Sequence, residues 1–298
     1  MSKPERLQQQ AGGYSLVDGI PFQLPVACHK TPVLMAAFPI NADKAEALMP
    51  GNEVHAFRLW KEGLLVITVV NYQITNIGKY IEFSIAIACT HGPKRAPRLL
   101  PALLMKYYDT GQYVFDLPVS TEVSVKGGKG IWGMPKHQAN LDFQISDTVV
   151  SSQYDLDGQL GMRIEIDKPN PWLKFSMGAA NFCQFRGMLG KSSIYFHGKV
   201  GFSLFKKNSA RLYIGEIERL RPLKQLGIGE TPVLTAFIPE ADGVLDDHFE
   251  NWFLSSAEKP TRVPEGMESV VNLGQSQEWL APPTASLAGA YMPGMKST

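Results

Sequence analysis

One lysine in this sequence follows a proline in an apolar, turn-rich segment. Lys136 comes after Gly133, Met134 and Pro135, and Trp132 lies just before them. A lysine amine is a potential nucleophile toward a carbonyl carbon. The same position also suits a surface lysine whose methylene stem packs on Trp132. Spacing alone leaves both interpretations open.

A glutamate lies on a face of a predicted strand that is not plainly directed to solvent. Residues 78–82 read Gly-Lys-Tyr-Ile-Glu. Because strand side chains alternate, Tyr80 and Glu82 share one face, and Ala86 and Ala88 continue it. A carboxylate there is either half-buried with a partner or at the mouth of a cavity. A cross-strand ion pair at the surface is the alternative.

A glycine-rich segment beside the lysine fits the spacing of dinucleotide-binding loops but lacks their context. Gly128, Gly130 and Gly133 give the pattern GxGxxG. Such a loop needs a strand before it and a helix after it, so that the helix N-terminus meets the pyrophosphate. Pro135 and an alternating strand pattern from Asn140 follow instead. We therefore interpret the segment as strand–loop–strand and expect no cofactor.

The histidines and cysteines form no recognisable metal or nucleophile motif. None of the six histidines pairs at HxH or HxxxH spacing, so we predict no metal, although a site assembled from distant residues stays open. Neither the serines nor Cys183 lie in a GxSxG elbow. Cys28, Cys89 and Cys183 are odd in number and widely spaced, which argues against a disulfide framework and fits a reducing cytoplasm.

Composition narrows the class of protein further. The 298 residues include 29 basic and 28 acidic side chains, and this balance argues against nucleic acid as a partner. The polar N-terminus lacks the apolar run of a signal peptide. The longest apolar stretches, 64–70 and 81–89, fall far short of the ~20 residues that span a bilayer, so we expect no membrane partner.

The elements that must position these residues are mostly strands. Val-, Ile-, Phe- and Tyr-rich segments separated by turn residues predict strands over 32–40, 54–60, 64–74, 79–89, 112–121, 140–146, 160–167, 193–206 and 211–220. Apolar spacing and capping residues predict helices over 41–49, 98–109 and 246–254. We expect one mainly β (α+β) domain over residues 1–298, built as a sandwich or barrel. A polar extension at about 1–20 and an irregular tail at about 258–298 flank it.

The two chemistry-bearing segments together carry a resemblance. Gly78-Lys79-Tyr80-Ile81-Glu82 is followed about fifty residues later by Gly133-Met134-Pro135-Lys136. This order resembles the acetoacetate decarboxylase-like superfamily, with a G-x-Y-x-E stretch and then a G-x-P-K stretch. The similarity extends loosely over residues 32–220.

The resemblance implies a fold, a site and a substrate class. The fold is a cone-shaped antiparallel β-barrel with a largely apolar interior and a few short helices. Lys136 is the Schiff-base nucleophile toward a keto acid, and Glu82 orients groups or handles protons beside it. Tyr80, His137, Trp132 and Met134 then surround the substrate. No external cofactor is needed, and we expect a homo-oligomer.

Two departures from the family pattern argue against acetoacetate itself as the substrate. The decarboxylases carry a second lysine directly after the nucleophile, where this chain has His137. They also carry an arginine near the N-terminal strand, thought to hold the substrate carboxylate, where this chain has Lys30 and Thr31. Neither departure removes the Schiff-base chemistry.

A lysine attacks a ketone only as the neutral amine, as is known for acetoacetate decarboxylase. Lowering a lysine pKa from ~10.4 to ~6.5 corresponds to ~5 kcal/mol of differential destabilisation of the ammonium. Trp132, Met134 and the barrel wall must supply most of this by desolvation, because an ordinary His137 is mostly neutral at pH 7. An ionised Glu82 acts in the opposite direction, so we expect it to be held by other donors or protonated.

These expectations favour decarboxylation of a small or medium β-keto acid by a carbon–carbon lyase. An aldolase, dehydratase or cyclase that uses the same iminium is the alternative within this class. A non-catalytic barrel that binds an apolar ligand is the alternative outside it.

Overall fold

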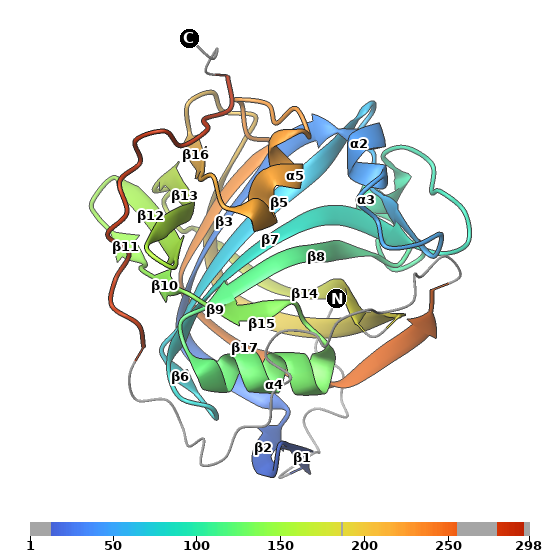
Figure 1. Ribbon diagram of the computed structural model, residues 1–298. Coiled ribbons are helices and arrows are strands. Elements are labelled where there is room, and N and C mark those ends of the chain that lie inside the picture. Colours follow the sequence, from blue (N-terminus) through green and yellow to red (C-terminus); the bar gives the residue numbers. More distant parts are fainter. Residues whose placement is uncertain (1–12, 186, 255–278, 295–298) are drawn as a thin grey trace.

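A computed structural model describes residues 13–185, 187–254 and 279–294. Within these residues, seven strands close into a barrel (Figure 1). Each strand pairs with the next, and the last pairs with the first. In that order they are β7 (Tyr80–His91), β5 (Glu62–Tyr72), β3 (Val26–Asn41), β17 (Leu234–Phe253), β15 (Met188–Leu204), β14 (Leu173–Phe185) and β8 (Thr110–Val119).

The barrel wall is largely apolar on both faces, because its strands are rich in aliphatic and aromatic residues. Along β7, Ile81, Phe83 and Ile85 turn outward into the main core, whereas Glu82 and Ser84 line an interior cavity. The alternation predicted from the sequence therefore holds on this strand. It places the motif glutamate inside the barrel.

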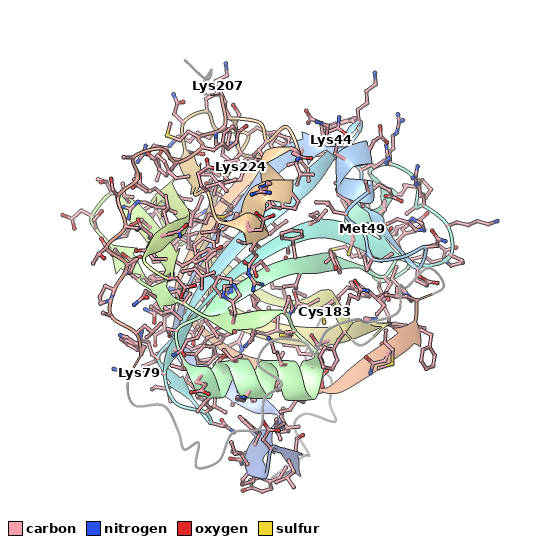
Figure 2. All side chains as sticks on the ribbon, viewed as in Figure 1. Lys44, Met49, Lys79, Cys183, Lys207 and Lys224 are labelled. Atoms are coloured by element: carbon pink, nitrogen blue, oxygen red, sulfur yellow. The ribbon has the colours of Figure 1, made fainter. Side chains whose placement is uncertain are left out.

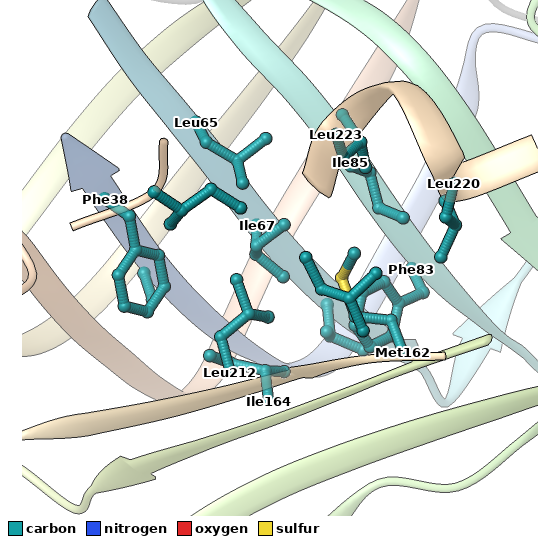
Figure 3. Close-up of a cluster of buried hydrophobic side chains, with 14 of the residues drawn as sticks. Phe38, Leu65, Ile67, Phe83, Ile85, Met162, Ile164, Leu212, Leu220 and Leu223 are labelled. Carbon is teal, nitrogen blue, oxygen red and sulfur yellow. The ribbon is translucent and has the colours of Figure 1, made fainter. Parts of the chain in front are cut away.

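A second layer covers one part of the outer surface of the barrel. It is a small antiparallel sheet, followed by two short helical turns. Figure 3 shows Met162, Ile164 and Leu212 of this layer packing against Phe83 and Ile85 of the wall. The sheet contains β10 (Asn140–Leu141), β11 (Gln144–Ile145), β12 (Val149–Leu156), β13 (Gln159–Asp167) and β16 (Ala210–Ile214), and the turns are η1 (Glu218–Leu220) and α5 (Arg221–Lys224).

The remaining elements extend or close the barrel. Helix α4 lies beneath the curved strands in Figure 1, with a hairpin beyond it. The hairpin is β1 (Gly13–Val17) and β2 (Ile20–Leu24); the extra barrel-sheet strands are β4 (Val54–Ala56), β6 (Ile74–Thr75) and β9 (Lys136–Gln138); the helices are α2 (Ala42–Glu46), α3 (Leu100–Leu103) and α4 (Glu122–Trp132).

The predicted fold class is confirmed, with one change in strand direction. The described residues are mostly strand with few helical residues, and the sheet closes as an antiparallel barrel over most of its pairs. However, β8 runs parallel to both β14 and β9. The strand predictions over 32–40, 79–89 and 160–167 fall on β3, β7 and β13.

Two of the three predicted helices need correction. Asn41 caps α2 as expected, because its side chain accepts from the backbone N–H groups of Asp43 and Lys44. The helix predicted over 98–109 shrinks to α3, and Leu103 is 79% exposed. The helix predicted over 246–254 is the end of strand β17, since aromatic residues favour strands as well as helix faces.

The N-terminal end contains regular structure that the sequence did not predict. The predicted polar extension at about 1–20 contains strand β1 and the start of β2. Part of the predicted irregular tail, 258–278, lies outside the described residues. The part that is described, 279–294, runs along the small sheet, where Thr284 and Ala285 each donate a backbone N–H to Asp155 Oδ2 at 2.7 Å. None of the described helices is long and apolar enough to cross a membrane.

Candidate active site

The structure buries Lys136 at the start of β9, with its amine directed at the motif glutamate. The residue is 3% exposed, and Nζ lies 2.7 Å from Glu82 Oε2. Nζ also donates to Ser124 Oγ at 3.0 Å. Three elements meet here: β9 supplies the lysine, β7 the glutamate and α4 the serine. By contrast, Lys44, Lys79 and Lys207 project from the rim of the molecule (Figure 2).

Tyr80 completes the surroundings of the amine. The Lys136 Nζ lies 5.3 Å from the centre of its ring, and this ring stacks on Tyr72 at 4.4 Å. Burial raises the pKa of Tyr80 well above its ordinary value, and the charge of Glu82 adds to the shift. Tyr80 therefore stays a neutral phenol and remains a possible hydrogen-bond donor beside the lysine.

Helix α4 owes its glycines to close packing. A Cβ on Gly128 would lie 2.3 Å from Lys136 Cδ, and one on Gly127 would lie 2.9 Å from the Phe22 ring. Gly133, at φ +64°, ends the helix in the left-handed region. The segment is therefore helix–turn–strand, which corrects the strand–loop–strand interpretation. Its GxGxxG glycines lie in the C-terminal half of a helix and at its C-cap, away from the N-terminus that a pyrophosphate requires.

A cavity of about 80 Å³ opens inside the barrel beside this group. Glu82 lines it, and so does Met134, as the resemblance implies. Most other lining side chains are aliphatic or aromatic. Among the lining residues that the structure describes, there is no arginine, lysine or histidine. The Lys136 amine lies 2.7 Å from Glu82 and is therefore in direct contact with a carboxylate of this lining.

His137 faces away from the amine, on the other side of β9. Its Nε2 lies 3.0 Å from Oδ1 of Asp116, which is fully buried. Arg219 donates to the same oxygen at 3.2 Å, and the Tyr154 hydroxyl lies 3.5 Å from Oδ2. This polar cluster stands against the second layer of the fold. The structure therefore does not bring His137 together with Lys136, although the two are adjacent in sequence.

Trp132 supports the site without lining the cavity. It is buried in a cluster between α4 and the N-terminal hairpin, and its indole N–H donates to the Asp246 carbonyl at 3.0 Å. Lys30 is exposed, Thr31 donates to the His29 carbonyl, and neither lines the cavity, so neither replaces the family arginine. Ser124 and Asp116 were not predicted, because neither belongs to a motif with a recognisable spacing.

Other reactive side chains do not form a competing centre in the described part of the chain. No three His, Cys, Asp or Glu side chains among the described residues gather closely enough to hold a metal ion. All three cysteines are buried and free. Burial raises the pKa of Cys28 and Cys183 to about 12, which keeps both as unreactive thiols at neutral pH.

The comparison with protein families decides the relationship. Residues 14–176, which include Glu82 and Lys136, match the model of the acetoacetate decarboxylase family. The chain belongs to this family. Membership places it among enzymes of lyase type. A comparison with curated protein sequences gave no match.

Solved structures of the family share the fold. Acetoacetate decarboxylase from Legionella pneumophila is 13% identical, with a TM-score of 0.56 over 85% of this chain and 92% of that one. An acetoacetate decarboxylase-like enzyme from Sphingomonas wittichii is 11% identical, with a TM-score of 0.54 over 77% and 94%. The enduracididine biosynthesis enzyme MppR is 12% identical, with a TM-score of 0.55 over 78% and 89%. At these identities the likeness extends to the fold alone.

Proposed function

We propose that the protein decarboxylates a β-keto acid through a Schiff base on Lys136. The observation that carries this proposal is the buried amine 2.7 Å from the Glu82 carboxylate at the edge of an apolar cavity. Glu82 accepts the ammonium proton, which frees the lone pair for attack on the ketone. Loss of water then gives the iminium.

The iminium is the electron sink of the reaction. The bond between the α-carbon and the carboxylate breaks, carbon dioxide leaves, and the electron pair passes through carbon to nitrogen to give an enamine. A proton returns to the α-carbon, and Glu82 or Tyr80 is placed to deliver it. Water then hydrolyses the new iminium, which releases a ketone and restores Lys136.

The charges around the cavity favour loss of the carboxylate. A substrate carboxylate bound here leaves water for an apolar space and lies near the charge of Glu82. No described lining residue supplies an arginine to compensate it. Departure as neutral carbon dioxide removes both the repulsion and the buried charge.

An aldol-type reaction is the second candidate, because two proton-handling groups stand beside one amine. Glu82 and Tyr80 both flank Lys136 Nζ, so one group can take a hydroxyl proton while the other serves the iminium. One structure of the relative MppR holds a condensation product of pyruvate and imidazole 4-carboxaldehyde. Carbon dioxide release separates the two candidates.

Borohydride trapping with a panel of keto acids tests the proposal. We expect substrate mass on the peptide that contains Lys136, and release of carbon dioxide from at least one β-keto acid. Lys136→Arg should lose the adduct, because arginine is never neutral near pH 7. Lys79→Arg, at an exposed lysine, should keep it. No adduct with any keto acid would identify a binding protein, and an adduct only on other lysines would refute the role of Lys136.

Location and assembly remain parts of the proposal. Three buried free thiols suit a reducing cytoplasm. The expected homo-oligomer stays a prediction, which sedimentation velocity measures directly.

A further inference from the structure

Two hydroxyl side chains lie on neighbouring strands of the cavity wall, two residues along the strand from Glu82. Thr68 on β5 and Ser84 on β7 pair in register, and both line the cavity. Two residues along a strand cover about 7 Å, so this pair lies within a short chain's reach of Glu82. Within the described part of the chain, the Thr68 hydroxyl oxygen is buried and has no hydrogen-bond partner. Such an atom in a cavity wall is satisfied when a ligand supplies the partner.

Two carboxamide side chains follow Thr68 and Ser84 further along the cavity wall. Gln112 on β8 donates to Asn181 Oδ1 on β14 at 2.7 Å, and both residues line the cavity. Ser192 on β15 pairs in register with Asn181, so both side chains leave the same face of the sheet. Ser192 is 3% exposed, and its hydroxyl oxygen has no partner among the described residues.

All these groups are neutral. The described lining contains no arginine, lysine or histidine, and Glu82 is its one carboxylate. A second carboxylate on the substrate would lose its water and meet no cation away from Lys136. A neutral group that donates and accepts hydrogen bonds would instead satisfy the hydroxyls and carboxamides without this cost.

We propose that the cavity selects keto acids whose far end is an uncharged, hydrogen-bonding group such as a carboxamide. The selection rests on the proposed Schiff base at Lys136, which fixes the ketone end. Thr68 and Ser84 contact the neutral group of a short tail, and Gln112 and Asn181 contact that of a longer one. The surrounding Met and Phe side chains hold the methylenes between.

Three β-keto acids of equal shape test the selection. They are 3-oxohexanedioate, its 6-carboxamide, and 6-methyl-3-oxoheptanoate, whose tails end in an anion, a neutral polar group and an apolar group. The readout is the concentration of each that gives half-maximal borohydride trapping on Lys136. We expect the carboxamide to be trapped at the lowest concentration and the diacid at the highest, with about tenfold between neighbours.

Removing one hydroxyl should change this order rather than the overall reactivity. In Thr68→Val, the advantage of the carboxamide over the apolar acid should fall about tenfold, because one hydrogen bond is lost. Thr235→Val is the matched control. Its hydroxyl oxygen, like that of Thr68, is buried and has no hydrogen-bond partner among the described residues, but Thr235 pairs with Ala36, whose side chain belongs to the outer core. The ratio between two substrates cancels any general loss of folded protein.

The outcomes separate this inference from the proposed function. Equal trapping of all three acids, or preference for the diacid, overturns the selection and leaves the Schiff base intact. The selection is also overturned if Thr68→Val weakens trapping of the carboxamide and of the apolar acid by the same factor. No adduct on Lys136 with any of the acids overturns the Schiff base and the selection together. The predicted order, lost in Thr68→Val and kept in Thr235→Val, supports the selection.

Discussion

At the scale of single residues, the site sets a buried amine against a buried carboxylate. Burial disfavours both charges, whereas their separation of 2.7 Å favours the ion pair. The sequence led us to expect other donors on Glu82 or a protonated carboxyl. The structure instead gives Lys136 itself as the partner. One proton transfer between them yields two neutral groups, and in the proposed reaction this transfer prepares the amine for attack.

Replacing Glu82 by glutamine tests this transfer. Glu82→Gln keeps the size of the side chain and removes its capacity to take up or release a proton. We expect turnover to fall by roughly 10²–10⁴, the usual contribution of a positioned acid–base group. Steady-state carbon dioxide release measures it, and Glu122→Gln, at an exposed position on α4, is the control. Unchanged turnover in folded Glu82→Gln would make this residue a structural partner only.

His137 tests whether the residue after the nucleophile tunes it. Its ring bonds to Asp116 on the far side of β9, so we expect His137→Ala to move the pH midpoint of imine formation by less than about one unit, equivalent to ~1.4 kcal/mol. Stability should fall by about 1–3 kcal/mol, because Asp116 loses the hydrogen bond to the His137 ring and keeps the one from Arg219. Trapping across pH and urea unfolding measure the two effects. A larger shift in the midpoint would assign His137 a role at the amine.

The chemistry-bearing residues were predictable where a motif linked them. Lys136, Glu82 and Tyr80 came from two short patterns, and the structure brings all three together. Ser124 gave no signal, because one serine in a glycine-rich segment has no distinctive spacing. Asp116 gave a weak signal: a carboxylate within an apolar strand needs a buried partner, which indicates a polar cluster.

At the scale of elements, helix α4 packs closely against the Lys136 side chain because Gly128 has no Cβ. Gly128→Ala should favour the helix by about 0.8–1 kcal/mol, because alanine is the better helix former. Its Cβ would nevertheless displace Lys136, so imine formation should slow by about 10²-fold. Rates of borohydride trapping and thermal unfolding measure the two effects separately.

Gly127→Ala is the matched control for this prediction. It is the same change one residue earlier in α4, but its Cβ would meet the Phe22 ring instead of the lysine. We expect it to disturb the packing of the N-terminal hairpin and to keep imine formation. Equal loss in both variants would show that the helix as a whole, and not the space above Gly128, positions Lys136.

Strands were predicted more reliably than helices, for a physical reason. Alternation over β7 and β13 has a short period that few other structures produce. Helix α4 contains three glycines of low helix propensity, and tertiary packing overrides that propensity. Thr121 as its N-cap and Glu122 in its first turn were the available signals. The end of β17 shows the opposite error, because its aromatic spacing also fits a helix.

At the scale of the whole molecule, barrel closure depends on pairings between distant segments. β3 pairs with β17, and β7 pairs with β8, in contacts that alternation along one strand cannot reveal. The residue patterns alone allowed a sandwich or a barrel, and family resemblance supplied the choice. The second layer was predicted only in part, because the residues of β12 show no clear alternation of apolar and polar side chains.

An ion cluster ties the barrel strands together at one rim. Asp109, just before β8, bonds to His91 at the end of β7 at 3.2 Å and to Lys191 on β15 at 2.7 Å. Lys191 also lies 3.2 Å from Glu250 on β17. Burial by itself raises the pKa of Asp109, but the hydrogen bonds from His91 and Lys191 outweigh it and lower that pKa below its ordinary value.

This direction fixes the sign of a pH effect on stability. Because the folded pKa of Asp109 lies below the unfolded one, the unfolded chain takes up the proton first as pH falls. The carboxylate therefore stabilises the fold above about pH 4, and the effect disappears as pH falls through the folded pKa. Asp109→Asn should be about 1–2 kcal/mol less stable at pH 7 and nearly equal to the wild type at the acid end. Asparagine also tolerates the φ of +44° at this position, so the backbone is not strained.

Urea unfolding of wild type and Asp109→Asn at pH 7, 5 and 3 measures this difference. Asp157→Asn is the control, because Asp157 is exposed in a turn and has a similar positive φ of +51°. We expect its unfolding free energy to follow the wild type at all three pH values, since it belongs to no rim cluster. A stability gap for Asp109→Asn that stays constant down to pH 3 would mean that shape, and not charge, holds the strands at this rim. A gap that closes on acidification would show that the barrel is locked by ionised groups joining β7, β8 and β15.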